Sequence, residues 1–160
     1  MNDVKEKIRH FDDLLTRLDE IEELEEETLL ARARDLAPEL LRLGEITLHF
    51  WIIARGGVPT TAKKEGFSIL ALHRQGAKGE PSFNACRESC RETVYQYNVI
   101  MQGDDDGQIL RSLRLLVMVV RHLALFISGK LQVAGLGDFC CASKPIRQKD
   151  TDMSEMVRQA

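Results

Sequence analysis

The sequence has no long uncharged apolar run and no excess of basic charge. Its most apolar stretch, residues 109–128, is interrupted by four ionisable side chains: Arg111, Arg114, Arg121 and His122. A membrane span of about 20 apolar residues is therefore not expected. Lys and Arg number 22 against 25 Asp and Glu, which gives a formal net charge of −3. Proteins dedicated to nucleic-acid binding usually carry a basic excess, so this balance argues against that class.

Cysteines are few, and the N-terminus has charges where a secretion signal would need its apolar segment. Four cysteines among 160 residues are too few for a disulfide scaffold. We therefore expect a cytoplasmic protein in which the cysteines are thiols or metal ligands. With 44% hydrophobic and 29% charged residues, the chain can build a core, which excludes the disordered and collagen-like classes.

The sequence contains no familiar catalytic or nucleotide-binding motif. Gly135 and Gly137 lack the third glycine of a dinucleotide site, and neither a Walker-type lysine motif nor Gly-x-Ser-x-Gly occurs. The acidic residues 104–106 do not form a calcium loop, because the first acid and the bidentate Glu of that loop are missing. These absences lean against an enzyme and leave the question open.

The first predicted helix covers residues 2–24 and is capped by Asn2 or Asp3. Its apolar residues recur every three or four positions and form one narrow stripe: Val4, Ile8, Phe11, Leu15, Leu18, Ile21 and Leu24. Such a stripe packs along one seam, either against the rest of the chain or against a second copy in a short coiled coil. Phe11, Leu15 and Leu18 are therefore candidate partner contacts. Residues 1–35 hold 12 acidic and 6 basic residues, so this arm could also face the basic body of the fold or a basic partner.

Proline and glycine set the bounds of the next two helices. A helix capped near Asp35 places Pro38 in its first turn and ends at Gly56-Gly57, and one helix kinked at Pro38 is the alternative. Residues 61–75 predict a short helix, although residues 67–72 have no clear period and could form a strand.

Two longer helices are predicted in the second half of the chain. Residues 82–102 carry one apolar face, made of Phe83, Cys86, Cys90, Val94, Tyr97 and Met101. Residues 107–128 are the most apolar segment and predict a central helix that ends at Gly129. A loop with a short strand near residues 131–134 is expected to follow.

These segments predict an all-α fold, a bundle of four to five helices with an irregular C-terminal tail. The helical bundle domain is expected to cover residues 1–130. Residues 131–160 are expected to form the tail that packs on it.

A basic stripe on the central helix is the most ordered polar feature. Arg111, Arg114, Arg121 and His122 fall within little more than one quadrant of that helix. The stripe could form a groove for an anion or an acidic partner. Alternatively, its members pair with the acidic first helix or mark the solvent side.

The four cysteines are the candidate metal ligands. Cys86 and Cys90 share a helix face, while Cys140 and Cys141 are adjacent in a glycine-rich segment. Four thiolates could hold zinc or an iron–sulfur cluster, but the spacing is not that of a zinc finger. We favour the alternative that Cys86 and Cys90 are buried core residues. In that setting the pKa of neither thiol should be lowered, and Cys140 and Cys141 should be the reactive pair.

The lack of a catalytic motif and the amphipathic N-terminal arm favour a small cytoplasmic interaction or accessory protein that acts through its helix faces. A regulatory role is one form of this hypothesis. Its partner would be another protein or a second copy of itself, with no membrane or nucleic acid involved. The alternative is a metal- or thiol-dependent binding protein that uses Cys86, Cys90, Cys140 and Cys141. A small enzyme without a familiar motif is the third hypothesis.

Overall fold

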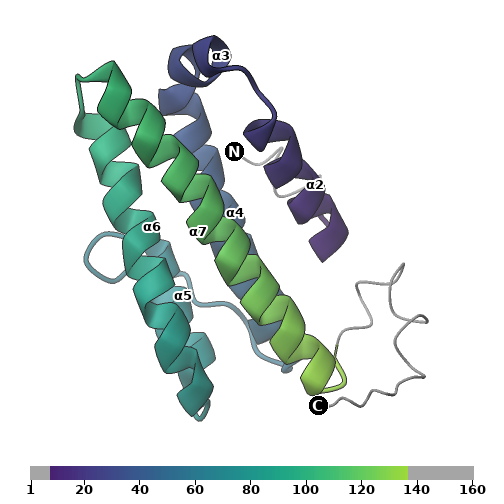
Figure 1. Ribbon diagram of the computed structural model, residues 1–160. Coiled ribbons are helices and arrows are strands. Elements are labelled where there is room, and N and C mark those ends of the chain that lie inside the picture. The colour runs from purple at the N-terminus through teal and green to yellow at the C-terminus, as the bar shows by residue number, and fades with distance from the viewer. Residues whose placement is uncertain (1–7, 137–160) are drawn as a thin grey trace.

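The computed structural model describes residues 8–136 and shows an all-α architecture over this range (Figure 1). This confirms the predicted fold class. The only β-type pairing in the described range is one isolated bridge, between Lys64 and Phe67. In chain order the helices are α2 (Phe11–Glu22), α3 (Glu26–Ala31), α4 (Ala33–Ala54), α5 (Ser68–Ala77), the short 3-10 helix η1 (Pro81–Phe83), α6 (Asn84–Gln102) and α7 (Asp106–Val133).

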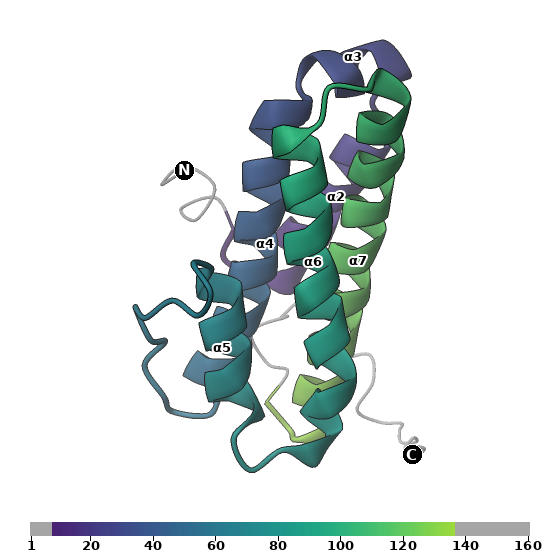
Figure 2. The same ribbon diagram turned by 90° about the vertical axis from the view of Figure 1, so that its left-hand side faces the viewer.

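Helix α7 is the centre of the bundle. It contacts α2, α3, α4 and α6, and its inward side chains are almost all aliphatic. Figures 1 and 2 show α4, α6 and α7 running side by side, with α2 along α7 on the side away from α6. Helix α3 lies across one end of the bundle, and α5 packs against α4 and α6 near the other end. No helix among the described residues is both long and apolar enough to cross a membrane.

Helix α2 begins later than predicted. The Asp13 carboxylate accepts hydrogen bonds from the backbone N–H groups of Arg9 and His10, at 3.0 and 3.1 Å. These bonds satisfy donors just before the helix, so His10 is its N-cap and Phe11 its first residue. The prediction of a continuous helix from Asn2 or Asp3 is therefore wrong for residues 8–10, and residues 1–7 lie outside the described range.

Helix α4 begins earlier than predicted and continues through Pro38. The chain breaks at Arg32, which ends α3 and precedes α4, so the predicted cap at Asp35 is wrong. Pro38 is the sixth residue of α4 and removes the hydrogen bond that would reach the carbonyl of Arg34. Arg34 is exposed, so water can satisfy that carbonyl and the helix tolerates the loss.

The two segments for which a strand was considered, residues 67–72 and 131–134, are mostly helical. Residues 69–72 are all buried in α5, which explains why they show no amphipathic period and excludes the strand alternative; residues 61–67 precede the helix. Helix α7 runs through Gly129 to Val133, so the predicted stop and the strand that follows it are wrong. The left-handed residue after α7 is Gly135, with φ of 73°. Residues 137–160 lie outside the described range.

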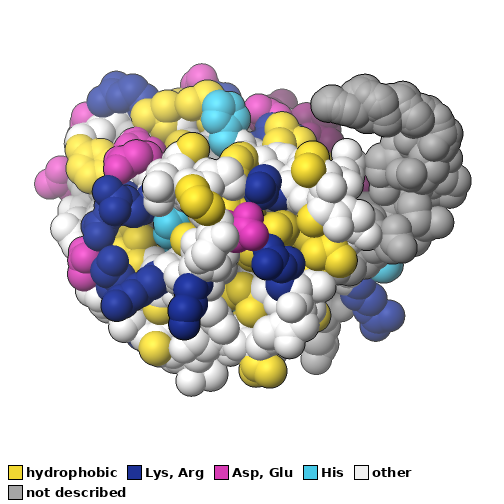
Figure 3. Space-filling model, turned by 90° about the horizontal axis from the view of Figure 1, so that it is seen from below, with side chains coloured by type: hydrophobic (Ala, Val, Ile, Leu, Met, Phe, Trp, Pro, Cys, Tyr) yellow, Lys and Arg dark blue, Asp and Glu magenta, His cyan; other side chains and the backbone are white. Residues whose placement is uncertain are grey.

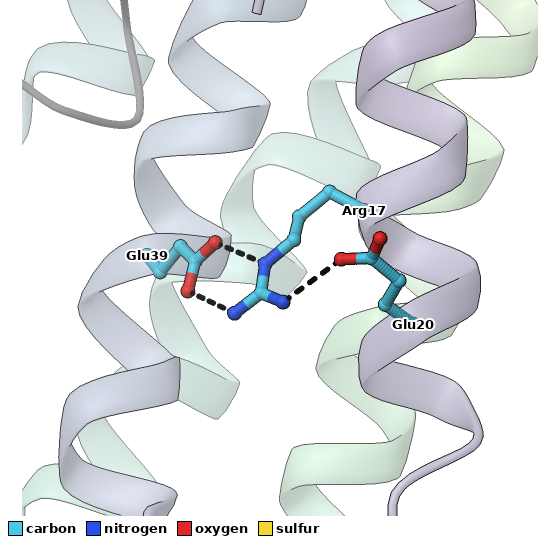
Figure 4. A network of polar contacts seen from close by, with 3 residues as sticks. All are labelled: Arg17, Glu20 and Glu39. Atoms are coloured by element: carbon cyan, nitrogen blue, oxygen red, sulfur yellow. Dashed lines mark hydrogen bonds and ion pairs between the residues drawn. The ribbon is translucent and has the colours of Figure 1, made fainter. Parts of the chain in front are cut away.

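Helix α2 is fastened to α4 by one polar cluster as well as by apolar packing. Arg17 donates hydrogen bonds to both carboxylate oxygens of Glu39, at 2.5 and 2.9 Å, and one to Glu20 at 3.1 Å (Figure 4). The rings of Phe11 and Phe50 pack nearby, with centroids 4.7 Å apart. The two-pronged arginine contact fixes the position of α2 along α4 more tightly than a single ion pair would.

Candidate functional site

The predicted basic stripe borders an apolar groove between α7 and the segment α2–α3. We call it the α7 groove. It has a volume of about 400 Å³, and its lining residues are Ile21, Glu22, Leu29, Leu113, Arg114, Val117, Met118, Arg121, His122 and Leu125. Most of this lining is aliphatic, and the charged members come from both sides.

Salt bridges cross between the two sides of the α7 groove. Arg121 contacts Asp19 and Glu22, each at 2.9 Å, and Arg114 contacts Glu26 at 3.4 Å. The basic stripe therefore pairs with the acidic segment of the same chain at two of its four members. His122 lines the groove, whereas Arg111 is exposed outside its lining.

Two side chains that the sequence analysis did not propose as contacts dominate the open side of the α7 groove. Met118 and Leu125 are 48% and 52% exposed, although both are large and apolar. They are seven residues apart, which places them on one face of α7 two turns from each other. Met118 lies in the same quadrant of α7 as the basic stripe. An apolar residue among charged ones was therefore the sequence signal for this exposed contact.

The apolar stripe of the first helix packs inside the chain. Phe11 and Leu18 are buried in the core, and Leu15 is half-buried against it. Of the two uses that the sequence left open, the stripe therefore serves the intramolecular one. These three residues hold α2 in place and do not offer a free apolar seam.

The acidic segment beside the α7 groove carries more charge than the basic stripe neutralises. Seven of the nine residues from 19 to 27 are Asp or Glu, and all seven are exposed. Glu23, Glu25 and Glu27 form no salt bridge with any residue in the range 8–136. The edge of the groove on the α2–α3 side is therefore negative.

A second cluster surrounds the helical cysteines. Cys86 and Cys90 are buried on α6, as expected for core residues, and His73 on α5 faces Cys86. The His73 Nε2 atom lies 2.8 Å from the carbonyl oxygen of Phe83. When Nε2 carries a hydrogen and donates it to this carbonyl, Nδ1 is the ring atom that can interact with the Cys86 thiol.

The electrostatics of this cluster correct the prediction that neither thiol pKa is lowered. A hydrogen bond from the Cys90 thiol and the charge and hydrogen bond of His73 lower the pKa of Cys86 to about 6. The hydrogen bond with Cys86, burial, and the charge of the Cys86 thiolate raise the pKa of Cys90 well above its ordinary value. Interaction with the Cys86 thiolate also raises the pKa of His73 despite burial. The sequence alone does not identify His73 as a functional candidate, because α5 and α6 are separate helices and His73 comes to Phe83 and Cys86 only when α5 folds back onto η1 and α6.

The four-cysteine metal site stays a prediction. Cys140 and Cys141 lie outside the described range. In the described part of the chain, no three or more His, Cys, Asp or Glu side chains are grouped so that they could hold a metal ion. Zinc and iron–sulfur clusters therefore gain no support from Cys86 and Cys90 with their neighbours.

Comparison with models of known protein families, with curated proteins and with solved structures gives no match.

Proposed function

We propose that this protein is an interaction protein whose α7 groove binds a basic, amphipathic helical segment of a partner protein. The observation that carries the proposal is the exposure of Met118 and Leu125 above an aliphatic floor. Large apolar side chains that line an open groove are typical of surfaces that bind another chain. The free thiols are in keeping with a cytoplasmic location, and no step in this proposal requires catalysis.

The groove has the form that suits a helix. Met118 and Leu125 are about two helical turns apart, or about 10 Å along α7. A partner helix with apolar residues at intervals of three, four and seven could place its anchors on either side of them. Ile21 and Leu29 supply the opposite wall.

Charge decides between a basic and an acidic partner. Arg114 and Arg121 are already neutralised by acidic residues of α2 and α3. The acidic residues without a salt bridge in the described range are Glu23, Glu25 and Glu27 on the α2–α3 side, and they outnumber Arg111, the unpaired arginine of the stripe on α7. A basic segment would therefore be attracted, whereas the acidic partner envisaged for the basic stripe would meet repulsion.

Photocross-linking in the cells that produce the protein tests this proposal. A photoreactive residue at position 118 is compared with one at Tyr95, which is 60% exposed on α6. We expect position 118 alone to capture protein segments with net positive charge and helical apolar spacing. Leu125→Glu should abolish that capture, and Val58→Glu, at an 82% exposed loop position, should not.

Three outcomes contradict the proposal. Capture of acidic segments would reverse the charge argument, and the same products from positions 118 and 95 would show non-specific contact. Capture of a second copy of this chain would assign the groove to self-association.

A thiol-dependent binding function is the second candidate, favoured by the pairing of Cys86 with His73. A metal-dependent version predicts about one zinc or iron atom per purified chain, protection of all four thiols together, and loss of folding when one is removed. Elemental analysis of the purified protein separates this version from the interaction function.

A further inference from the structure

A second pocket lies between α5 and the first half of α6, away from the α7 groove. We call it the basic pocket. It has a volume of about 530 Å³, and five of its ten lining residues are basic: Lys64, Arg74, Lys78, Arg87 and Arg91. No Asp or Glu lines it. Figure 3 shows Lys and Arg side chains gathered on the left-hand side of this end of the bundle.

Most of this positive charge is not neutralised by the chain. Arg91 pairs with Glu65 at 3.0 Å, but the other four basic side chains form no salt bridge with any residue in the described range. The whole chain has a formal net charge of −3, so this excess is local and runs against the average. Like charges held around one cavity repel one another, and a bound anion would relieve that repulsion.

Helix termini account for only one of these basic residues. Arg74 lies in the last turn of α5, where the carbonyl end of a helix favours a cation. Arg87 is the fourth residue of α6, near the end of the helix that disfavours one, and its charge opposes protonation of the buried His73. The position of Arg87 therefore has an unfavourable electrostatic cost within the fold.

The rest of the lining is suited to the uncharged part of a ligand. Leu70 and Ala77 line the pocket with apolar atoms, and Asn84 adds an amide. A volume of about 530 Å³ falls within the range of small-molecule sites. A planar guanidinium can donate two parallel hydrogen bonds to a phosphate or a carboxylate. A phosphate monoester carries a charge of about −1.5 to −2 and three acceptor oxygens, so it can pair with several of these basic side chains at once, which a carboxylate with one charge and two oxygens cannot.

We propose that the basic pocket binds a small phosphate ester, with Arg74, Lys78 and Arg87 contacting the phosphate oxygens. The rest of the ligand lies against Leu70 and Ala77. This site is separate from the α7 groove and does not depend on a protein partner.

Calorimetric titration of the full chain at low salt tests the proposal with three probes: inorganic phosphate, glucose 6-phosphate, and vesicles of phosphatidylcholine with phosphatidic acid. We expect one equivalent of glucose 6-phosphate to bind, and inorganic phosphate to bind more weakly at the same site. Arg74→Gln and Arg87→Gln should each weaken binding about tenfold, the usual effect of removing a hydrogen bond to a charged group. Arg32→Gln, at an exposed arginine on the α3–α4 connection, should leave it unchanged.

Several results would overturn the proposal. If neither inorganic phosphate nor glucose 6-phosphate binds at about 10 mM, a limit of very weak affinity, the site is excluded. Binding that the two arginine variants leave unchanged would also exclude it. Binding of the vesicles alone would assign the charge to a membrane surface. Both arginines are exposed and form no salt bridge with any residue from 8 to 136, so the variants should keep their helical circular dichroism. If one does not, Lys78→Gln provides the same test.

Discussion

Removing both partners of the Cys86 thiol should convert it from a thiolate to a neutral thiol at pH 7. The Cys90 thiol and His73 lower the pKa of Cys86 from 9.0 to about 6, and the Cys90 hydrogen bond is the larger cause. Cys90→Ala removes the first partner. His73→Gln removes the second partner and its charge while keeping an N–H group that can reach the Phe83 carbonyl.

The size of the effect follows from the two pKa values. With a pKa of about 6, about nine-tenths of Cys86 is thiolate at pH 7, whereas a pKa of 9.0 leaves about 1%. In the double variant, burial of Cys86 without a compensating charge should move its pKa to the ordinary value or above it. The thiolate population at pH 7 should therefore fall by a factor of about 90.

Ultraviolet absorbance of the thiolate is the suitable measurement. An alkylation rate would report a smaller change, because a thiolate of higher pKa is a better nucleophile by roughly 20-fold over three pKa units, which cancels most of the population effect. The titration uses a Cys140→Ser, Cys141→Ser background so that only the helical pair contributes. Cys90 should not contribute thiolate absorbance between pH 5 and 8, because its own pKa is raised.

We expect one absorbance step near pH 6, shifted upward in each single variant and absent below pH 8 in the double variant. During this step the proton leaves Cys86 while His73, whose pKa is raised, keeps its own. Cys86→Ser should erase the step and so assign it. The absence of a step between pH 5 and 8 in the Cys140→Ser, Cys141→Ser background, or a step that His73→Gln leaves in place, would refute the reasoning.

Three further predictions concern stability, each measured by chemical denaturation with a change in the free energy of unfolding as the readout. Gln96 is buried and its Oε1 atom has no hydrogen-bond partner within residues 8–136, whereas its Nε2 atom donates to the exposed Glu92 at 2.6 Å, a bond that water can replace on the Glu92 side. Gln96→Met should therefore stabilise the fold by up to about 1 kcal/mol, and destabilisation would show that the Glu92 hydrogen bond outweighs the unpartnered oxygen. Gly129 lies inside α7 with open space at its Cβ position, so Gly129→Ala should stabilise by about 0.5–1 kcal/mol, and no gain would contradict a helical residue there. Arg17→Lys should lose the two-pronged contact with Glu39 and cost about 1 kcal/mol, an effect that should vanish when Glu39 is already Gln.

Helical periodicity located most elements, but their ends depended on contacts that the pattern does not contain. The apolar face of α6 predicted that helix almost to its bounds, because its buried residues recur at regular spacing. The stop at Gly129 failed because glycine ends a helix only when the backbone turns left-handed, and that turn falls at Gly135. The start of α2 was set by a carboxylate, Asp13, that reaches back to the chain before it.

The candidate sites divide in the same way. The basic stripe and the burial of Cys86 could be predicted, because both follow from the positions of residues on one helix. The pairing of Cys86 with His73 could not, since it depends on how α5 folds back onto α6. The partners of Arg121 were also beyond the sequence, because Asp19 and Glu22 are about 100 residues away along the chain.

The single tryptophan of the chain lies beside the cluster that holds Cys86. Trp51 donates a hydrogen bond from Nε1 to the carbonyl of Gly76 at 3.2 Å, and its ring packs 5.0 Å from that of Phe83, the residue whose carbonyl accepts from His73. The Arg55 guanidinium covers the same ring, at 5.0 Å. The protein therefore carries a built-in fluorophore at the junction of α4, α5 and η1. Its emission wavelength and quenching can report a shift of α5 against α6 without any added label.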